Sequence, residues 1–114
     1  MNHRVPGNYL RTYRKRSGLT QREVGQILGY QNQWQVSRHE RGRTSPPLPT
    51  ALAYEVIFRV PVATLFPRTR VRAALSVEAK LVILEQGLNR QGGKGRTGKA
   101  AAHKFAWLAQ RRAR

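Results

Sequence analysis

Residues 18–42 read GLTQREVGQILGYQNQWQVSRHERG, and this stretch decides the fold of the chain. Thr20 and Glu23 form a T-x-x-E capping box, in which each side chain satisfies the other residue's free backbone N–H at the start of a helix. The helix is predicted over residues 21–28, and Gly29 ends it because glycine adopts the left-handed conformation most readily. Another helix is predicted over about residues 32–41.

Small and apolar residues indicate how these two helices pack. Gly25 lies on the inner face of the first helix, where a steep crossing leaves no room for a large side chain. Val36 lies on the inner face of the second helix and can contact Val24. Two short helices joined by a tight glycine-containing turn form a helix-turn-helix arrangement. The outward face of the second helix then carries Gln33, Trp34, Ser37 and Arg38 at helical spacing. Glutamine and arginine hydrogen-bond adenine and guanine in the major groove, so this face suits base reading.

The flanking sequence extends the motif to a compact all-α domain of five helices over residues 1–67. Asn8 can cap a helix over residues 9–17. Prolines make the connection 43–49 extended. The last elements expected are an apolar helix over residues 50–60, a short turn through Leu65 and Phe66, and Pro67 as the residue that closes the domain.

Residues 68–114 form a basic extension that is predicted to be helical. Ser76 can cap a helix that runs to about Asn89, with an apolar stripe of Val77, Leu81, Leu84 and Leu88. A last helix over about residues 99–112 places Ala101, Phe105 and Leu108 on one side. Between the two helices, residues 90–98 are rich in glycine and polar, which is typical of a flexible hinge.

The composition indicates a polyanionic partner. The chain has 114 residues with 22 Lys and Arg, five Glu and no Asp, and its net charge is +17 at pH 7. Repulsion among so many positive charges destabilises the folded state, so a polyanionic partner is the best explanation for the high net charge. Without cysteine there are neither disulfides nor thiolate-bound zinc. Because we find no long apolar run and no signal peptide, we expect a cytoplasmic, nucleoid-associated protein that makes no membrane contact.

In these features the sequence resembles the Cro and phage-repressor type of helix-turn-helix regulators, which are XRE-like and have a lambda-repressor-like fold. The resemblance covers about residues 8–67. The matching positions are Leu10, Arg14, Gly18 to Gln21, Glu23 to Gly25, Leu28, Gly29, Val36 to Arg38, Glu40 to Gly42, Pro47 and Leu65 to Pro67. The sequence departs from the family in having Gly25 instead of the usual Ala, and a turn after Gly29 that is one residue longer.

The resemblance also implies roles for individual residues. It assigns base reading to Gln33, Trp34 and Arg38, and phosphate or edge contacts to Gln21 and Asn32. It also implies a structural ion pair between Arg14 and Glu40, because a buried charge is tolerated only when an opposite charge lies beside it. Further phosphate contacts are expected from the polar and basic residues Arg22, Gln35, Arg41 and Arg43.

The remaining aromatic residues and histidines can also be interpreted one by one. Trp34 either reads thymine methyl groups or folds back onto the scaffold, and His39 is expected to pack in the interior. No catalytic residue, metal ligand or cofactor is predicted, because His3 and His103 are isolated from each other and from acids. Residues 93–99 have the spacing of a phosphate-binding loop, but Ala100 follows where Ser or Thr is needed, and no strand precedes them.

The expected partner is double-stranded DNA, and we expect a homodimeric repressor that binds an inverted repeat in it. Two alternatives remain: an antitoxin whose residues 68–114 bind a protein partner, and an RNA-binding protein. For the extension itself, we favour helices that make the dimer over a disordered basic tail, because the small first domain cannot cover their apolar stripes.

Overall fold

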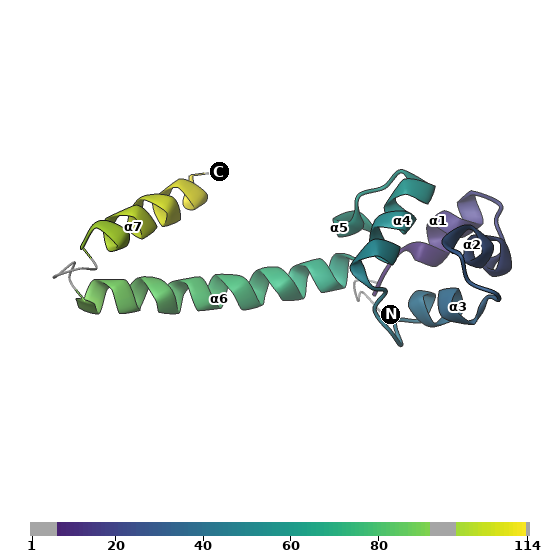
Figure 1. The fold of residues 1–114 in the computed structure, drawn as a ribbon, viewed down its shortest axis with the longest axis horizontal. Coiled ribbons are helices and arrows are strands. Elements are labelled where there is room, and N and C mark those ends of the chain that lie inside the picture. The colour runs from purple at the N-terminus through teal and green to yellow at the C-terminus, as the bar shows by residue number, and fades with distance from the viewer. Residues whose placement is uncertain (1–6, 92–97, 114) are drawn as a thin grey trace, which may run out of the picture. The chain divides into compact units, whose positions relative to one another are not determined.

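The computed structural model describes residues 7–91 and 98–113, and in these ranges all regular structure is helical (Figure 1). The helices are α1 (Leu10–Arg16), α2 (Gln21–Leu28), α3 (Trp34–Glu40), α4 (Leu48–Phe58), α5 (Val62–Leu65), α6 (Pro67–Gln91) and α7 (Gly98–Arg112). The predicted all-α class is confirmed, with a five-helix lambda-repressor-like domain followed by a basic helical extension. None of the described helices is long and apolar enough to cross a membrane.

The chain divides into two compact units, one up to Arg72 and one from Ala73 onward. Helices α1 to α5 belong to the first unit, and α7 belongs to the second. Pro67 does not close the first unit as expected, because it is the first residue of α6. Proline suits the first helical position, since its fixed φ is helical and the missing N–H would have no partner there. The helix therefore begins at Pro67 and not at Ser76.

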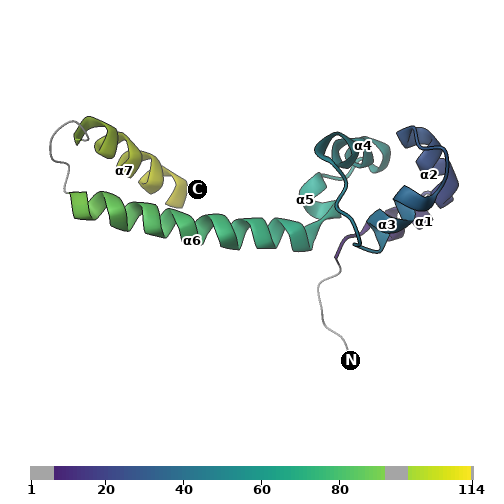
Figure 2. The same cartoon turned by 60° about the horizontal axis from the view of Figure 1, so that its bottom comes forward.

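The core of the first unit draws residues from each of its short helices. It consists of Leu10, Val24, Val36, Ala51, Tyr54, Leu65 and Phe66, all at most 9% exposed. Around it α3 packs against α1 and α2, while α4 packs against α1 and α5 (Figure 2). The backbone N–H of Tyr9 donates to the carbonyl of Leu65 at 2.8 Å, which joins the start of α1 to α5.

Local capping interactions position α2. Thr20 Oγ1 accepts from the N–H of Glu23 at 3.0 Å, and Glu23 Oε1 accepts from the N–H of Thr20 at 2.9 Å. Gly29 ends the helix with φ of 91°. The capping box and both ends of the helix over residues 21–28 are thus confirmed. Asn8 is not the N-cap of α1 as predicted, because Tyr9 occupies that position, but Asn8 Oδ1 accepts from the N–H of Leu10 at 3.1 Å.

Three helices of the first unit have other bounds than predicted, and the first of them, α1, covers Leu10–Arg16 instead of residues 9–17. α4 begins at Leu48, because Pro49 occupies its first turn instead of ending the extended connection. α3 covers only Trp34–Glu40, with Gln33 as its N-cap residue. Asn32 precedes the helix, and its Oδ1 accepts from the N–H of Trp34 at 3.0 Å. The recognition helix expected over residues 32–41 is therefore shorter at both ends.

The second unit is a hairpin of α7 and the part of α6 that begins at Ala73. Its core consists of Leu88, Ala101 and Leu108, with Leu81 and Phe105 packed against them. Arg111 Nη2 lies 2.7 Å from Glu78 Oε1, and Arg112 forms an ion pair with Glu85. These contacts contradict a disordered tail for the described residues. Residues 92–97 of the expected hinge 90–98 lie outside the described ranges, and its first two residues end α6.

Candidate nucleic-acid interface

The outward face of α3 carries exposed polar, basic and aromatic side chains. Trp34, Arg38 and Arg41 follow one another at i, i+4 and i+7, so they lie on one side of the helix. All three are exposed, Trp34 to 63%, so its indole does not fold back onto the scaffold. Gln35 is exposed on the adjoining side. Arg41, expected only as a phosphate contact, thus extends the row that begins with Trp34.

Ser37 does not belong to this outward face, and its prediction as an exposed base contact is wrong. Its side chain is only 6% exposed. The reason is that α3 has seven residues and packs against both α1 and α2, so more of its circumference is covered than an amphipathic pattern suggests. Helical spacing placed Ser37 beside Gln33, which is itself half-buried just before the helix.

His39 anchors the inner face of α3. It is 3% exposed, and its Nδ1 lies 2.8 Å from the hydroxyl oxygen of Tyr54 on α4. The two rings meet edge to face with their centroids 5.8 Å apart. Burial lowers the pKa of His39 below its ordinary value, because the charged imidazolium loses its hydration. The side chain of His39 thus packs in the interior, as predicted, and is not part of the outward face of α3.

A buried ion pair holds the end of α3 against α1. Arg14 Nε lies 2.6 Å from Glu40 Oε2, and Arg14 Nη2 donates to Glu40 Oε1 at 3.1 Å. The side chains are only 12% and 4% exposed. Arg14 Nη1 also donates to the carbonyl of Leu19 at 3.0 Å. This two-pronged geometry is the strong form of such a pair, and it holds the C-terminal end of α3 against α1.

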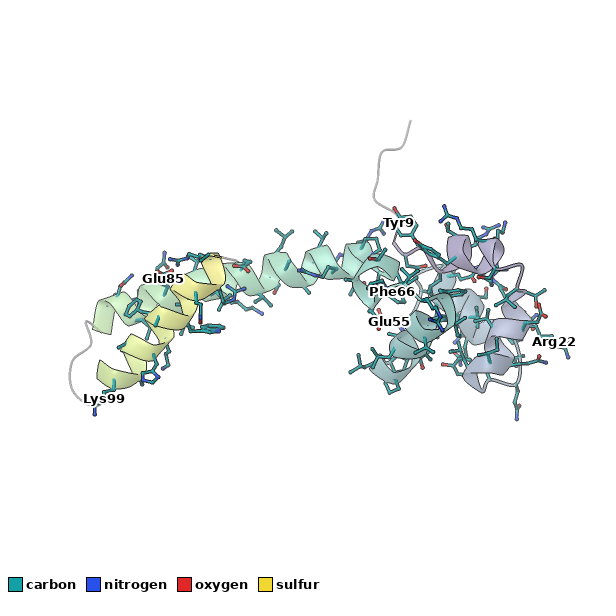
Figure 3. The ribbon with its side chains drawn as sticks, turned by 90° about the horizontal axis from the view of Figure 1, so that it is seen from above. Tyr9, Arg22, Glu55, Phe66, Glu85 and Lys99 are labelled. Carbon is teal, nitrogen blue, oxygen red and sulfur yellow. The ribbon has the colours of Figure 1, made fainter. Side chains whose placement is uncertain are left out.

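Gln21, the first residue of α2, joins the same cluster. Its Nε2 donates to Glu40 Oε1 at 3.0 Å, so the amide expected to touch phosphate also positions α3. Gln21, Arg22 and Gln33 line one surface hollow together with Arg14, Leu19 and Thr20. A second hollow beside it is lined by Arg11, Arg14, Gln21, Glu40 and Arg41. Arg22 lies at the outer surface of α2 (Figure 3).

These hollows are lined by three of the six residues expected to contact phosphate. Gln21 and Arg22 come from α2, and Arg41 comes from the end of α3. Arg43 lies just beyond α3, where its N–H donates to the carbonyl of Arg38 at 3.0 Å. Asn32 is exposed, and its side-chain oxygen accepts from the N–H of Trp34. Arg11, an exposed arginine on α1, also lines the second hollow.

The turn between α2 and α3 passes unusually close to Gly25. A Cβ at this glycine would lie 2.7 Å from the carbonyl oxygen of Asn32, which is closer than real Cβ contacts. The two departures from the family pattern are therefore coupled. The longer turn runs over the position that the Cβ of an alanine would occupy, so residue 25 has to be glycine. The sequence contains both departures from the family pattern, but only the structure connects them.

Carboxylates do not compete for the basic residues of this surface. All three glutamates of the first unit accept hydrogen bonds from within it: Glu23 from Thr20, Glu40 from Arg14 and Gln21, and Glu55 from the N–H of Val62 at 2.7 Å. The bonds to Thr20 lower the pKa of Glu23. In contrast, the exposed cations include Arg11, Lys15, Arg16, Arg22, Arg38, Arg41 and Arg43. The surface around α3 is thus strongly positive.

No cluster of three or more metal-ligating side chains occurs in residues 7–91 and 98–113.

The geometry of α2 and α3 defines a helix-turn-helix module: a capped supporting helix, a glycine turn and a second helix with an open polar face. Residues 7–66 match the model of the helix-turn-helix domain family, which is just over half of the chain. The chain therefore belongs to this family, in agreement with its resemblance to XRE-like DNA-binding regulators. Neither the curated proteins nor the solved structures include a significant match.

Proposed function

We propose that this protein is a sequence-specific transcriptional repressor that docks α3 in the major groove of DNA. The observation that carries the proposal is the exposed row Trp34, Arg38 and Arg41 on a helix whose surroundings contain no free carboxylate among the described residues. A short helix with long polar side chains and an exposed indole fits the groove, where bases present hydrogen-bonding edges and thymine methyl groups.

Base reading is assigned to the middle and the start of α3. Arg38 offers a two-pronged donor that matches guanine, and Trp34 offers an apolar ring for thymine methyl groups. Gln33 lies at the start of the helix, where it can reach a base edge from the hollow beside α2. Ser37 has no part in base reading, since it is buried.

Phosphate contacts fix the register of α3 in the groove. They are assigned to the residues around the two hollows and next to the helix: Gln21, Arg22, Asn32, Gln35, Arg41 and Arg43. The positive end of the α2 dipole adds to the attraction at Gln21 and Arg22. Because the side-chain nitrogen of Gln21 already binds Glu40, its contact with phosphate depends on this ion-pair cluster.

A homodimer completes the proposal. Two copies of α3 about 34 Å apart would meet successive major grooves of an inverted repeat. Bound upstream of a promoter, such a dimer represses by excluding the transcription machinery, and the protein would act in the cytoplasm at the nucleoid. The family resemblance supports the role as a repressor.

The test is binding to the duplex upstream of the protein's own gene and to a scrambled duplex of equal length. Replacing Arg38 by Ala should cost about 1–3 kcal/mol on the specific duplex and almost nothing on the scrambled one. Arg90→Ala, an exposed arginine at the end of α6, is the matched control and should leave the ratio of the two affinities unchanged. An equal loss on both duplexes with Arg38→Ala would exclude base reading by this residue.

A second candidate function is an antitoxin, in which the second unit binds a protein partner. The observation in its favour is the large apolar surface that the hairpin leaves uncovered, at Leu75, Val82, Ile83 and Trp107. Co-purification with the product of a neighbouring gene, lost in a Trp107→Glu variant that still binds DNA, would support it. An RNA-binding protein would instead show no preference for duplex DNA over single-stranded RNA.

A further inference from the structure

A hollow at the start of α6 is lined by polar side chains from three segments of the first unit. The segments are the residues just before α1, the connection between α3 and α4, and the first two turns of α6. The solvent-accessible polar residues that line this hollow, which we call the α6 hollow, are Asn8, Thr44, Ser45, Arg68, Thr69 and Arg72. They supply two guanidinium groups, three hydroxyl groups and one amide, all of which can donate hydrogen bonds.

The lining of the α6 hollow is positively charged. Arg68 and Arg72 are four residues apart, so they lie on the same side of α6. No carboxylate lines the hollow among the described residues. The three glutamates of the first unit, Glu23, Glu40 and Glu55, accept hydrogen bonds elsewhere in it. Donors and positive charge without a carboxylate favour an anionic ligand.

Contacts within the first unit hold the walls of the α6 hollow in place. Asn8 Nδ2 donates to the carbonyl of His39 at 2.9 Å, which joins the segment before α1 to the end of α3. A Cβ on Gly7 would lie 3.6 Å from Arg68 Nη1, so this guanidinium lies directly beside the same segment. Walls that are fixed before binding lower the entropic cost of ordering them around a ligand.

The size of the α6 hollow limits the ligand to one small group. Its volume is about 120 Å³, whereas sites for drug-sized molecules measure about 300–1,000 Å³. A phosphate group is small, carries about 1.5 to 2 negative charges at pH 7 and has three strongly accepting oxygens. Arginine binds phosphate with two parallel N–H bonds, and hydroxyl groups can donate to the oxygens that remain.

We propose that the α6 hollow is a binding site for a phosphate group, held by Arg72 and by the hydroxyl groups of Thr44 and Ser45. The match to the helix-turn-helix family ends at residue 66, before the residues that α6 contributes to the hollow. The inference goes beyond the proposed function, because none of these residues is assigned to base reading or to the phosphate contacts around α3. Two sources present the same chemistry, a small phosphorylated molecule and the backbone of DNA.

Isothermal titration calorimetry of the full chain with inorganic phosphate tests the inference, with acetate at equal ionic strength as the reference. We expect saturable phosphate binding that Arg72→Gln weakens at least about tenfold, since hydrogen bonds between charged groups are the strong ones. Arg70→Gln removes an exposed arginine that does not line the hollow, and it should leave the phosphate affinity unchanged. Equal weakening by the two variants would show attraction by net charge alone and would overturn the inference.

A variant that keeps every charge separates the site from the net charge of the protein. Thr44→Val with Ser45→Ala removes two hydroxyl donors from the lining, and it should weaken phosphate binding at least about threefold. Circular dichroism checks that the helices are retained. Phosphate bound as tightly by this folded variant as by the native chain would overturn the inference.

Binding of the scrambled duplex by the same variants distinguishes the two sources. If the backbone of DNA supplies the phosphate, Arg72→Gln and the hydroxyl variant should both weaken duplex binding more than Arg70→Gln does, and inorganic phosphate should compete with the duplex. If a small molecule supplies it, only the calorimetric titration should change. Variants that alter neither measurement would overturn the inference. Preference of the native chain for its upstream duplex tests the proposed function separately, because the scrambled duplex already reports any backbone contact of the hollow.

Discussion

At position 25 two physical preferences oppose each other. Alanine is favoured over glycine inside a helix by about 1 kcal/mol. A Cβ on Gly25, however, would lie 2.7 Å from the carbonyl oxygen of Asn32. Since that oxygen belongs to the backbone of the turn that leads into α3, only a shift of the turn could relieve the contact. The packing cost should therefore exceed the gain in helix propensity.

Gly25→Ala is accordingly expected to lower the free energy of unfolding by about 1–3 kcal/mol, the usual cost of overpacking. Urea denaturation followed by circular dichroism measures it. Gly87→Ala is the control, since the nearest side-chain atom to the new Cβ on α6 is Arg90 Nη2 at 3.9 Å. This control should gain about 0.5–1 kcal/mol. A Gly25→Ala variant as stable as the native chain would show that the turn moves freely.

His39 makes stability depend on pH. Its pKa is lowered from the ordinary value of 6.5 by burial, so the folded state disfavours the protonated ring. The contribution of the neutral ring is complete above 6.5 and is lost as the pH falls through the lowered pKa. We expect the free energy of unfolding to decrease as the pH falls below the ordinary value of 6.5, and the decrease to be smaller in His39→Gln. His103→Gln, on the exposed side of α7, should retain the native pH dependence.

At the scale of the elements, the sequence predicts best where one local interaction decides. The capping box of Thr20 and Glu23 determines the start of α2, and Gly29 determines its end, so both were predictable. Proline is ambiguous, because the same residue ends one helix and begins another, and Pro67 was assigned the wrong role. The burial of Ser37 was not predictable, since it depends on two helices that flank α3 from different parts of the chain.

The ion pair between Arg14 and Glu40 joins three elements, because Gln21 at the start of α2 also donates to Glu40. Glu40→Gln would remove the charge while preserving the shape, and it would leave the guanidinium of Arg14 largely buried without its counter-ion. Loss of one partner from such a pair costs about 3–5 kcal/mol of unfolding free energy. Chemical denaturation measures this loss, and DNA affinity should decrease with it as α3 loses its orientation.

Glu78→Gln is the matched control for Glu40→Gln. It breaks the ion pair with Arg111, in which the glutamate side chain is 61% exposed to water. Solvent screens exposed pairs, so the stability should barely change. If the two variants were equally mild, α3 would not depend on the buried pair, and the assigned orientation of its outward face would lose its support.

At the scale of the whole molecule, the proposed sequence-reading face and the larger share of the net charge lie in different parts of the chain. Residues 1–67 carry ten Lys and Arg with three Glu, while residues 68–114 carry 12 with two. Sequence-reading side chains are proposed only on α3, which belongs to the first part. The extension adds net charge without an outward face of the same kind, so its contribution to DNA binding should be electrostatic and independent of base sequence.

The double variant Lys99→Gln with Lys104→Gln on α7 tests this separation, because both lysines are exposed. Removing one lysine that binds a phosphate should reduce the slope of log affinity against log salt by about 0.9, because fewer counterions are released on binding. We expect weaker binding to the upstream and the scrambled duplex by the same factor, so their ratio stays constant. Fluorescence anisotropy over a salt series measures both quantities. An unchanged slope would exclude these lysines from DNA contact, and a changed ratio would mean that the extension also reads sequence.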